Sequence, residues 1–234
     1  MSKAVGHARE RNILPYCLIA LLRAGEMSVD PSRLMRFVLE MRQAGITDAR
    51  VLSALERTPR THYAPPHLEG LALDDVALPL AHGQTMTKPS AVARMVAALD
   101  PHPGDSVLEV GTGSGYQAAV LSALAHKVVT LERWRALAAD ARGRFGTGRL
   151  MRTFAHVADG LEGWADSAPY DRIVINAAVE AFPLALLDQL KAGGVLVAPV
   201  GERLIRYRNG EREDLGPIKF APAGHGVPEE PPVG

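Results

Sequence analysis

The 234-residue sequence has a single cysteine, few aromatic residues and no net charge. One cysteine, Cys17, excludes an intrachain disulfide and a metal cluster built from cysteines. The eight histidines show no spacing such as H-x-x-x-H, so their pattern predicts no metal site. Because Lys plus Arg and Asp plus Glu are balanced at 26 each, the charge gives no reason to expect nucleic acid as a partner.

A long hydrophobic run is also missing. The most apolar stretch near the N-terminus, Ile13 to Leu22, is far short of the ~20 residues that span a membrane. Basic residues precede it, as in a secretory signal, but Arg23 and Glu26 follow at once and no A-x-A cleavage site is present. We therefore expect no membrane association and a cytoplasmic location.

The most informative segment that is present is a glycine-rich loop after an apolar stretch, VLEVGTGSGYQ at residues 107–117. This pattern predicts a buried parallel strand that turns sharply into a helix. The glycines permit positive φ and let a ligand lie against the backbone, and the helix directs its free N–H groups at that ligand. The loop residues expected to hold a ligand are Gly111, Thr112, Gly113, Ser114 and Gly115.

The spacing of this loop favours S-adenosylmethionine over a dinucleotide. A dinucleotide loop reads G-x-G-x-x-G, whereas this one reads G-x-G-x-G, with Glu109 two residues ahead of it. S-adenosylmethionine has no pyrophosphate and carries an ammonium and a sulfonium, so an acid at the strand end suits it. An ordinary glycine-rich turn in a doubly wound domain is the alternative for the loop taken alone.

Two further acids end predicted strands. Glu132 comes 23 residues after Glu109 (132 − 109), close to the ~20-residue interval at which an acid meets ribose hydroxyls. The alternative for Glu132 is a solvated acid beside Arg133. Asp159-Gly160 ends a third strand, where the carboxylate can accept a hydrogen bond from an adenine amino group or form a plain Asx turn. We predict that Glu109, Glu132 and Asp159-Gly160 help to hold the cofactor.

Strands and helices alternate through the second half of the chain. Strands are expected near residues 106–110, 127–131, 153–157, 171–176 and 194–199, with helices after the first four and a tight turn at Gly193-Gly194. This order predicts a doubly wound, Rossmann-like α/β fold.

Additional elements are expected at both ends of this domain. Helices predicted from Ser32 to Gly45 and from about Asp48 to Glu56 form an N-terminal helical cap. A hairpin around Asn209-Gly210 forms a C-terminal β extension. The tail from Ala221, rich in Pro, Gly and Glu, is predicted to be disordered.

The segment ALPLAHGQTMTKP, residues 77–89, is too polar and too rich in glycine and proline to be core. Together with the glycine loop it resembles the protein-L-isoaspartate O-methyltransferase family. Further ordered blocks at residues 50–60, 170–179 and 185–194 carry the same resemblance. It divides the chain into an N-terminal extension of unclear role (1–32), a methyltransferase domain (33–220) and the tail (221–234), with Met27 as an alternative start.

The resemblance implies methyl transfer from S-adenosylmethionine to the free carboxylate of isoaspartyl residues in damaged proteins or peptides, by a monomer. The family's active-site serine falls at Thr87, which keeps the hydroxyl but adds a methyl group that restricts χ1 and crowds the pocket. Thr87 could also cap the helix after Pro89. His82 and Gln84 are expected to fix the loop, and Asn176 stands where the family usually has a small hydroxyl residue.

Two other functions stay open. The first is a carboxyl methyltransferase with a dedicated peptide substrate, which the change to Thr87 would mark. The second is a non-enzymatic module that keeps the fold. Such a module would be expected to lose an acid or a glycine of the cofactor loop, and none is lost.

Overall fold

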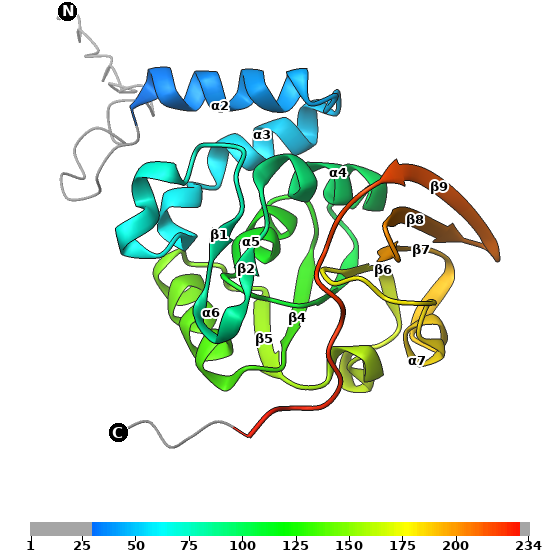
Figure 1. Ribbon diagram of the computed structural model, residues 1–234. Coiled ribbons are helices and arrows are strands. Elements are labelled where there is room, and N and C mark those ends of the chain that lie inside the picture. Colours follow the sequence, from blue (N-terminus) through cyan, green and yellow to red (C-terminus); the bar gives the residue numbers. More distant parts are fainter. Residues whose placement is uncertain (1–29, 230–234) are drawn as a thin grey trace, which may run out of the picture. The chain divides into compact units, whose positions relative to one another are not determined.

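The computed structural model describes residues 30–229, and residues 31–229 belong to one compact unit (Figure 1). The predictions about Cys17, the apolar stretch and a start at Met27 concern positions outside the described residues. The α-helices are α2 (Pro31–Gln43), α3 (Ala49–Arg57), α4 (Pro89–Leu99), α5 (Tyr116–Ser122), α6 (Arg135–Thr147) and α7 (Leu184–Asp188). The 3-10 turns are η1 (Arg60–Tyr63), η2 (Pro66–Leu71), η3 (Ala81–Gly83), η4 (Gly160–Glu162) and η5 (Ala165–Ser167).

The strands form one large sheet and one small hairpin. They are β1 (Leu78–Pro79), β2 (Thr85–Met86), β3 (Ser106–Val110), β4 (Lys127–Glu132), β5 (Thr153–Val157), β6 (Tyr170–Ile175), β7 (Leu190–Val200), β8 (Arg203–Arg208) and β9 (Glu211–Pro217). The large sheet has the order β5-β4-β3-β6-β7-β8-β9, parallel as far as β7 and antiparallel beyond it. The chain order reverses at β3, and the carboxyl end of a parallel sheet at such a reversal is where ligands bind in this architecture.

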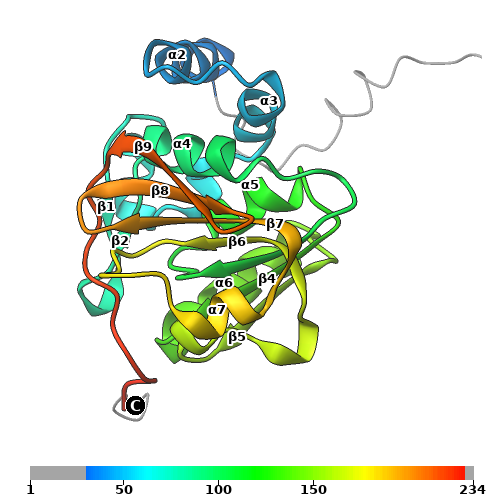
Figure 2. The same cartoon turned by 90° about the vertical axis from the view of Figure 1, so that its right-hand side faces the viewer.

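The central strands are apolar because both of their faces are covered. In β3 every residue after Ser106 is buried, and Glu109 pairs in register with Thr130 of β4 and Val174 of β6. Helices α4 and α5 cover one face of the sheet, and α7 packs against the other (Figure 2). Helix α6 lies on the same face as α5, because a Cβ on Gly115 at the start of α5 would be 2.8 Å from the Phe145 ring of α6. The predicted doubly wound α/β fold is confirmed.

The N-terminal helical cap is present as α2 and α3, which pack on each other and on α4. Asp48 begins α3, because its side chain accepts a hydrogen bond from the Arg50 N–H at 2.8 Å. The predicted hairpin joins β8 to β9, and Asn209 (φ 50°) and Gly210 (φ 85°) supply the two left-handed residues that its tight turn needs.

Three local predictions are wrong. No α-helix follows β5, where the chain makes η4 and η5 instead. Gly193-Gly194 does not form the turn before β7 but lies inside this strand, where the register with β6 shifts between Tyr170 and Arg172. The tail is not disordered over residues 221–226, because its backbone is hydrogen-bonded to other parts of the chain.

Candidate active site

The glycine loop lines a pocket at the carboxyl end of the parallel strands. Gly111 and Gly113 both adopt left-handed backbone, with φ of 91° and 52°, which is costly for any other residue. The Gly111 and Thr112 N–H groups donate to the Leu131 carbonyl at 2.8 and 3.1 Å, which ties the loop to the end of β4. A Cβ on Gly113 would contact only Leu80 of the β1–β2 segment, at 3.6 Å, so this side of the loop faces open space.

Glu132 is buried beneath the mouth of this pocket, with 5% of its surface exposed. One carboxylate oxygen accepts the Gly113 N–H at 2.8 Å, and the other accepts the Trp134 N–H at 3.1 Å. The carboxylate thus joins the glycine loop to the end of β4. The alternative of a solvated acid is wrong.

Glu109 does not reach the pocket. It has no exposed surface and lies below the loop, where it accepts hydrogen bonds from Thr130 at 2.6 Å and from Asn176 at 3.0 Å. Burial raises the pKa of Glu109 to about 8, and the nearby charge of Glu132 adds to this rise, against the two hydrogen bonds. Glu109 therefore supports the loop from beneath, which corrects the expectation that it holds the cofactor directly.

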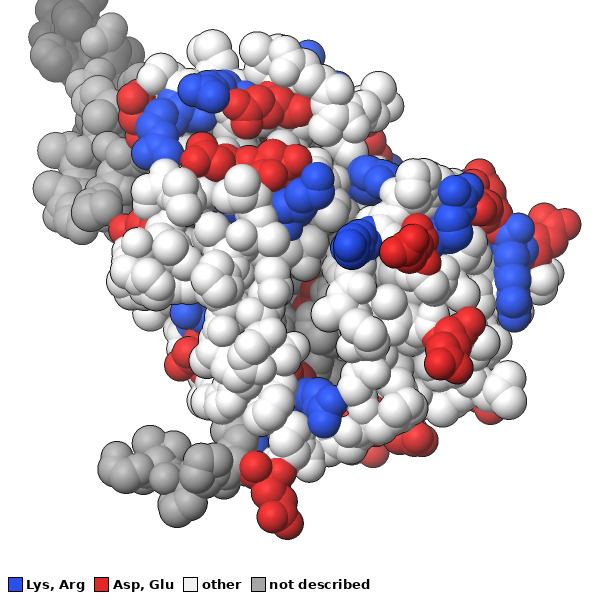
Figure 3. Space-filling model, viewed as in Figure 1, with Lys and Arg blue, Asp and Glu red and all other residues white. Residues whose placement is uncertain are grey.

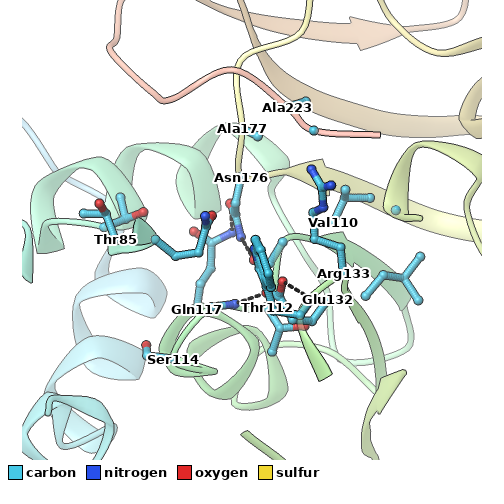
Figure 4. A pocket seen from close by; sticks show the side chains of 18 of the residues that line it. Thr85, Val110, Thr112, Ser114, Gln117, Glu132, Arg133, Asn176, Ala177 and Ala223 are labelled. Carbon is cyan, nitrogen blue, oxygen red and sulfur yellow. Dashed lines mark hydrogen bonds between the residues drawn. The ribbon is translucent and has the colours of Figure 1, made fainter. Parts of the chain in front are cut away.

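Asn176 connects Glu109 to the pocket wall. Its amide nitrogen also donates to the Gly111 carbonyl at 3.1 Å, and its oxygen accepts a hydrogen bond from Gln117 of α5 at 2.8 Å. Figure 4 shows Asn176 and Gln117 across the pocket from Arg133. Because both ends of this amide are bonded within the protein, Asn176 fixes the loop. The sequence could not assign it that role.

The remaining loop residues hold the turn into α5. The Thr112 hydroxyl lies 2.7 Å from that of Thr130, and the Ser114 hydroxyl accepts the Tyr116 N–H at 3.3 Å. A Cβ on Gly115 would lie 2.8 Å from the Phe145 ring, so α5 can approach α6 only with glycine there. All five predicted loop residues are brought together in this turn, and all except Gly115 line the pocket.

Asp159 and Gly160 lie at the end of β5. One oxygen of Asp159 accepts the Leu161 N–H at 3.0 Å, so the Asx turn exists. The other oxygen accepts the N–H of Gly226 at 2.6 Å, a contact from the C-terminal segment that the sequence did not reveal. Gly160 and Leu161 line the pocket, whereas Asp159, the residue before them, does not.

Thr87 lies on the other wall, in the segment that leads into α4. It is half-buried, and among residues 30–229 its hydroxyl makes no hydrogen bond. Its carbonyl accepts a hydrogen bond from Arg60 at 3.1 Å, and the same guanidinium donates to the carbonyls of Ala72 and Val76. Arg60 is 1% exposed, so this segment is held from inside the protein.

Thr87 does not cap α4. The cap comes from Asp75, whose carboxylate accepts the Ser90 N–H at 2.8 Å and the Ser90 hydroxyl at 2.7 Å. Asp75 is 15 residues away from Ser90 in the sequence, which is why the local pattern did not reveal it. Thr87 therefore lines the pocket without serving as the helix cap.

His82 and Gln84 fix the segment, as expected. The His82 ring stacks on Trp134 with 4.4 Å between ring centroids and 10° between planes. Gln84 donates from its side chain to the His82 carbonyl at 3.0 Å. The stack closes the β1–β2 segment onto the residues that follow β4.

The pocket opens on the face shown in Figure 3, where uncharged atoms flank the hollow on both sides and Lys or Arg side chains lie at its upper and lower ends. Within residues 30–229, no group of three or more His, Cys, Asp or Glu side chains is placed to hold a metal ion. None of the helices in the described part of the chain is long and apolar enough to cross a bilayer.

The family model of protein-L-isoaspartate(D-aspartate) O-methyltransferases matches residues 32–219. The chain belongs to this family. The match agrees with the resemblance expected over residues 33–220. A protein-L-isoaspartate O-methyltransferase of Xanthobacter autotrophicus is 47% identical over 210 residues, which cover 86% of this chain and 96% of the relative. Another family member, from Azorhizobium caulinodans, is 50% identical over 200 residues, which cover 82% of this chain and 92% of that relative.

Solved structures of the family share the fold. A protein-L-isoaspartate O-methyltransferase superposes with a TM-score of 0.74 at 22% identity, covering 83% of this chain and 67% of its own. A Plasmodium falciparum protein is described as a candidate member of the family in complex with S-adenosyl-L-homocysteine. It superposes with a TM-score of 0.70 at 19% identity, and the match covers 81% of this chain and 97% of its own.

Proposed function

We propose that this protein transfers a methyl group from S-adenosylmethionine to the free carboxylate of isoaspartyl residues in damaged proteins and peptides. One observation carries the proposal: an intact glycine loop and Thr87, whose hydroxyl makes no hydrogen bond within residues 30–229, line the same pocket in a chain of this family. The relatives that are 47% and 50% identical are named for this activity. The first step of protein repair is thus the proposed role.

The residues present fit S-adenosylmethionine. The open side of Gly113 offers a surface on which a ligand can lie against the backbone, and the Glu132 carboxylate offers acceptors at the end of β4. When bound, the cofactor supplies a methyl group that the substrate carboxylate oxygen takes as the carbon–sulfur bond breaks, leaving S-adenosylhomocysteine. The residues proposed to hold it are Gly111, Thr112, Gly113, Ser114, Gly115, Glu132, Asp159 and Gly160.

The protein's own task is placement. A substrate carboxyl group with a pKa of about 4 is ionised at neutral pH, so no general base has to remove a proton. The Thr87 hydroxyl can donate a hydrogen bond to one carboxylate oxygen and leave the other to react. The β1–β2 segment, closed by the His82–Trp134 stack, shields this position from water.

The dedicated-substrate alternative needs a surface that recognises one sequence. The uncharged atoms on both sides of the hollow support a substrate class defined by the isoaspartyl linkage rather than by many charged flanking residues. We also propose that the protein is monomeric, cytoplasmic and without affinity for nucleic acid. Size-exclusion chromatography tests the monomeric state, cell fractionation tests the location, and DNA titration tests the affinity for nucleic acid.

Two peptides that differ only in the linkage of one aspartate test the reaction. With labelled S-adenosylmethionine, we expect label to enter the isoaspartyl peptide and not its aspartyl isomer. Equal labelling of both isomers would indicate a general carboxyl methyltransferase. Cofactor binding without labelling of any isoaspartyl peptide would favour a dedicated substrate, and no cofactor binding would favour the non-enzymatic module.

Three variants test the role of Thr87. We expect Thr87→Ser to keep or raise turnover, since it keeps the hydroxyl and relieves crowding, and Thr87→Val to lose turnover while binding the cofactor normally. An unsatisfied buried acceptor costs about 1–3 kcal/mol, which corresponds to a rate loss of about 5- to 150-fold. Thr47→Val is the matched control, because Thr47 is exposed between α2 and α3. If Thr87→Val matches the parent, the hydroxyl has no role.

A further inference from the structure

The chain continues past β9 and crosses the end of the sheet at which the pocket lies. Figures 1 and 2 both show this segment descending along the edge where the parallel strands end. Pro222, Ala223 and Gly224 line the pocket. The family match stops at residue 219, so residues 221–226, here called the C-terminal strap, lie beyond it.

The first attachment of the strap is at the end of β6. The Ala178 N–H donates to the Ala221 carbonyl, and the Ala223 N–H donates to the Ala178 carbonyl, both at 2.8 Å. Ala178 and Pro222 form a parallel bridge. This part of the strap behaves as a short additional strand that follows Asn176 and Ala177 of the pocket wall.

The second attachment is at the far side of the pocket, after β5. The Gly226 N–H donates to one oxygen of Asp159 at 2.6 Å, and this carboxylate is also bonded to the Leu161 N–H. Because β5 and β6 flank β4 and β3 in the sheet, the strap spans the ends of all four strands. It therefore passes over the glycine loop and over the residue that follows Glu132.

Between the two attachments the strap lies against Arg133. A Cβ on Gly224 would be 1.5 Å from Nη1 and 2.7 Å from Cζ of Arg133, so the guanidinium occupies the space of a missing side chain. Within residues 30–229, Arg133 makes no hydrogen bond and no ion pair, its Nε is buried without a partner, and its guanidinium lies 5.9 Å from the Trp134 ring centre. Figure 4 shows Arg133 beside Glu132 in the pocket.

We propose that the C-terminal strap is the outer wall of the cofactor pocket and sets how fast cofactor and product leave it. The inference rests on the proposed function, since it takes the ligand of this pocket to be S-adenosylmethionine. A ligand on the glycine loop lies beneath a chain segment anchored on both sides, so opening one attachment widens its way out. Gly224 lets the strap come close enough to keep the Arg133 guanidinium against the pocket, where its unpaired donors can meet a ligand.

Truncation after Phe220 tests the strap directly, because it keeps β9 and the buried Ile218. Titration calorimetry gives the Kd of S-adenosyl-L-homocysteine, and a chase of bound labelled S-adenosylmethionine gives its release rate. We expect release to be faster and binding weaker by about tenfold or more, the scale of losing one good hydrogen bond to a charged group. The melting temperature of the ligand-free protein reports whether the truncated chain is folded.

Two point variants keep the test decisive if truncation prevents folding. Gly226→Pro removes the N–H group that donates a hydrogen bond to Asp159, which breaks the second attachment of the strap. Gly224→Ala adds a methyl group that displaces the Arg133 guanidinium. Both are expected to speed release, whereas Gly104→Ala, whose Cβ meets nothing within 4 Å, should match the parent protein. Parental release rates in the folded variants would overturn the strap proposal alone. A full-length protein that does not bind the cofactor would instead overturn the proposed function and this inference with it.

Discussion

Replacing Glu132 by glutamine removes one charge from beneath the pocket and changes the shape of the side chain very little. The parent carboxylate accepts two backbone N–H groups, from Gly113 at 2.8 Å and from Trp134 at 3.1 Å. A glutamine has one acceptor oxygen for these two donors and turns its own NH2 group toward the other. One backbone N–H at a site that is 5% exposed is then left without a partner.

The expected loss follows from these two bonds. An unsatisfied buried donor costs about 1–3 kcal/mol, and weakening the other bond from charged to neutral costs about 1 kcal/mol more. We therefore expect the free energy of unfolding to fall by about 2–4 kcal/mol. In the proposed site, the ribose hydroxyls of the cofactor would also lose a charged acceptor, so the Kd should rise by about 5- to 150-fold, the equivalent of 1–3 kcal/mol.

Calorimetric titration with S-adenosyl-L-homocysteine measures the affinity, and urea unfolding measures the stability. Glu56→Gln is the matched control, because Glu56 is exposed on α3 and should give parental values for both. An unchanged Kd in a folded Glu132→Gln protein would refute the assignment of this acid to the cofactor, even if stability falls. An unchanged stability would refute the stated contribution of its two hydrogen bonds.

Three further predictions concern the support of the pocket. Gly160→Ala places a Cβ 2.4 Å from a methyl group of Val110 and should cost about 1–3 kcal/mol in urea unfolding; adding Val110→Ala should restore part of it, and no restoration would contradict the contact. Glu109, with a pKa of 4.5 unfolded and about 8 folded, holds its proton more tightly in the folded protein. Its contribution to stability should be full below pH 4.5 and be lost as pH rises to about 8, by up to about 1.4 kcal/mol per pH unit, whereas Glu109→Gln should lack this slope. Arg60→Lys keeps the charge but cannot reach three carbonyls, so it should lower stability by about 1–3 kcal/mol and slow turnover through Thr87; parental turnover would show that Arg60 does not position Thr87.

The strands and the terminal hairpin could be predicted because their signals are local. A buried parallel strand reads as an apolar run, and Asn209-Gly210 has the backbone freedom that a tight turn demands. The position of Glu132 at the end of a strand followed from its interval of 23 residues after Glu109. Its burial did not, since it depends on the N–H groups of Gly113 and Trp134.

The features that the sequence did not reveal depend on partners far along the chain. The strap looked disordered because its Pro-rich and Gly-rich sequence has no local pattern, and it is ordered by Ala178, Arg133 and Asp159. Glu109 was assigned to the cofactor because of its place before the loop. A strand buried on both faces instead hides this acid completely.

The measurement that tests the central claim most directly follows the fate of an isoaspartyl peptide. The peptide is incubated with the full-length protein and S-adenosylmethionine, and its aspartyl isomer is quantified over time by chromatography. Methylation should lead to the aspartyl isomer only when both protein and cofactor are present, because the methyl ester cyclises to a succinimide that hydrolyses in part to aspartate. A protein that binds the cofactor but leaves the isoaspartyl peptide unchanged would contradict the account.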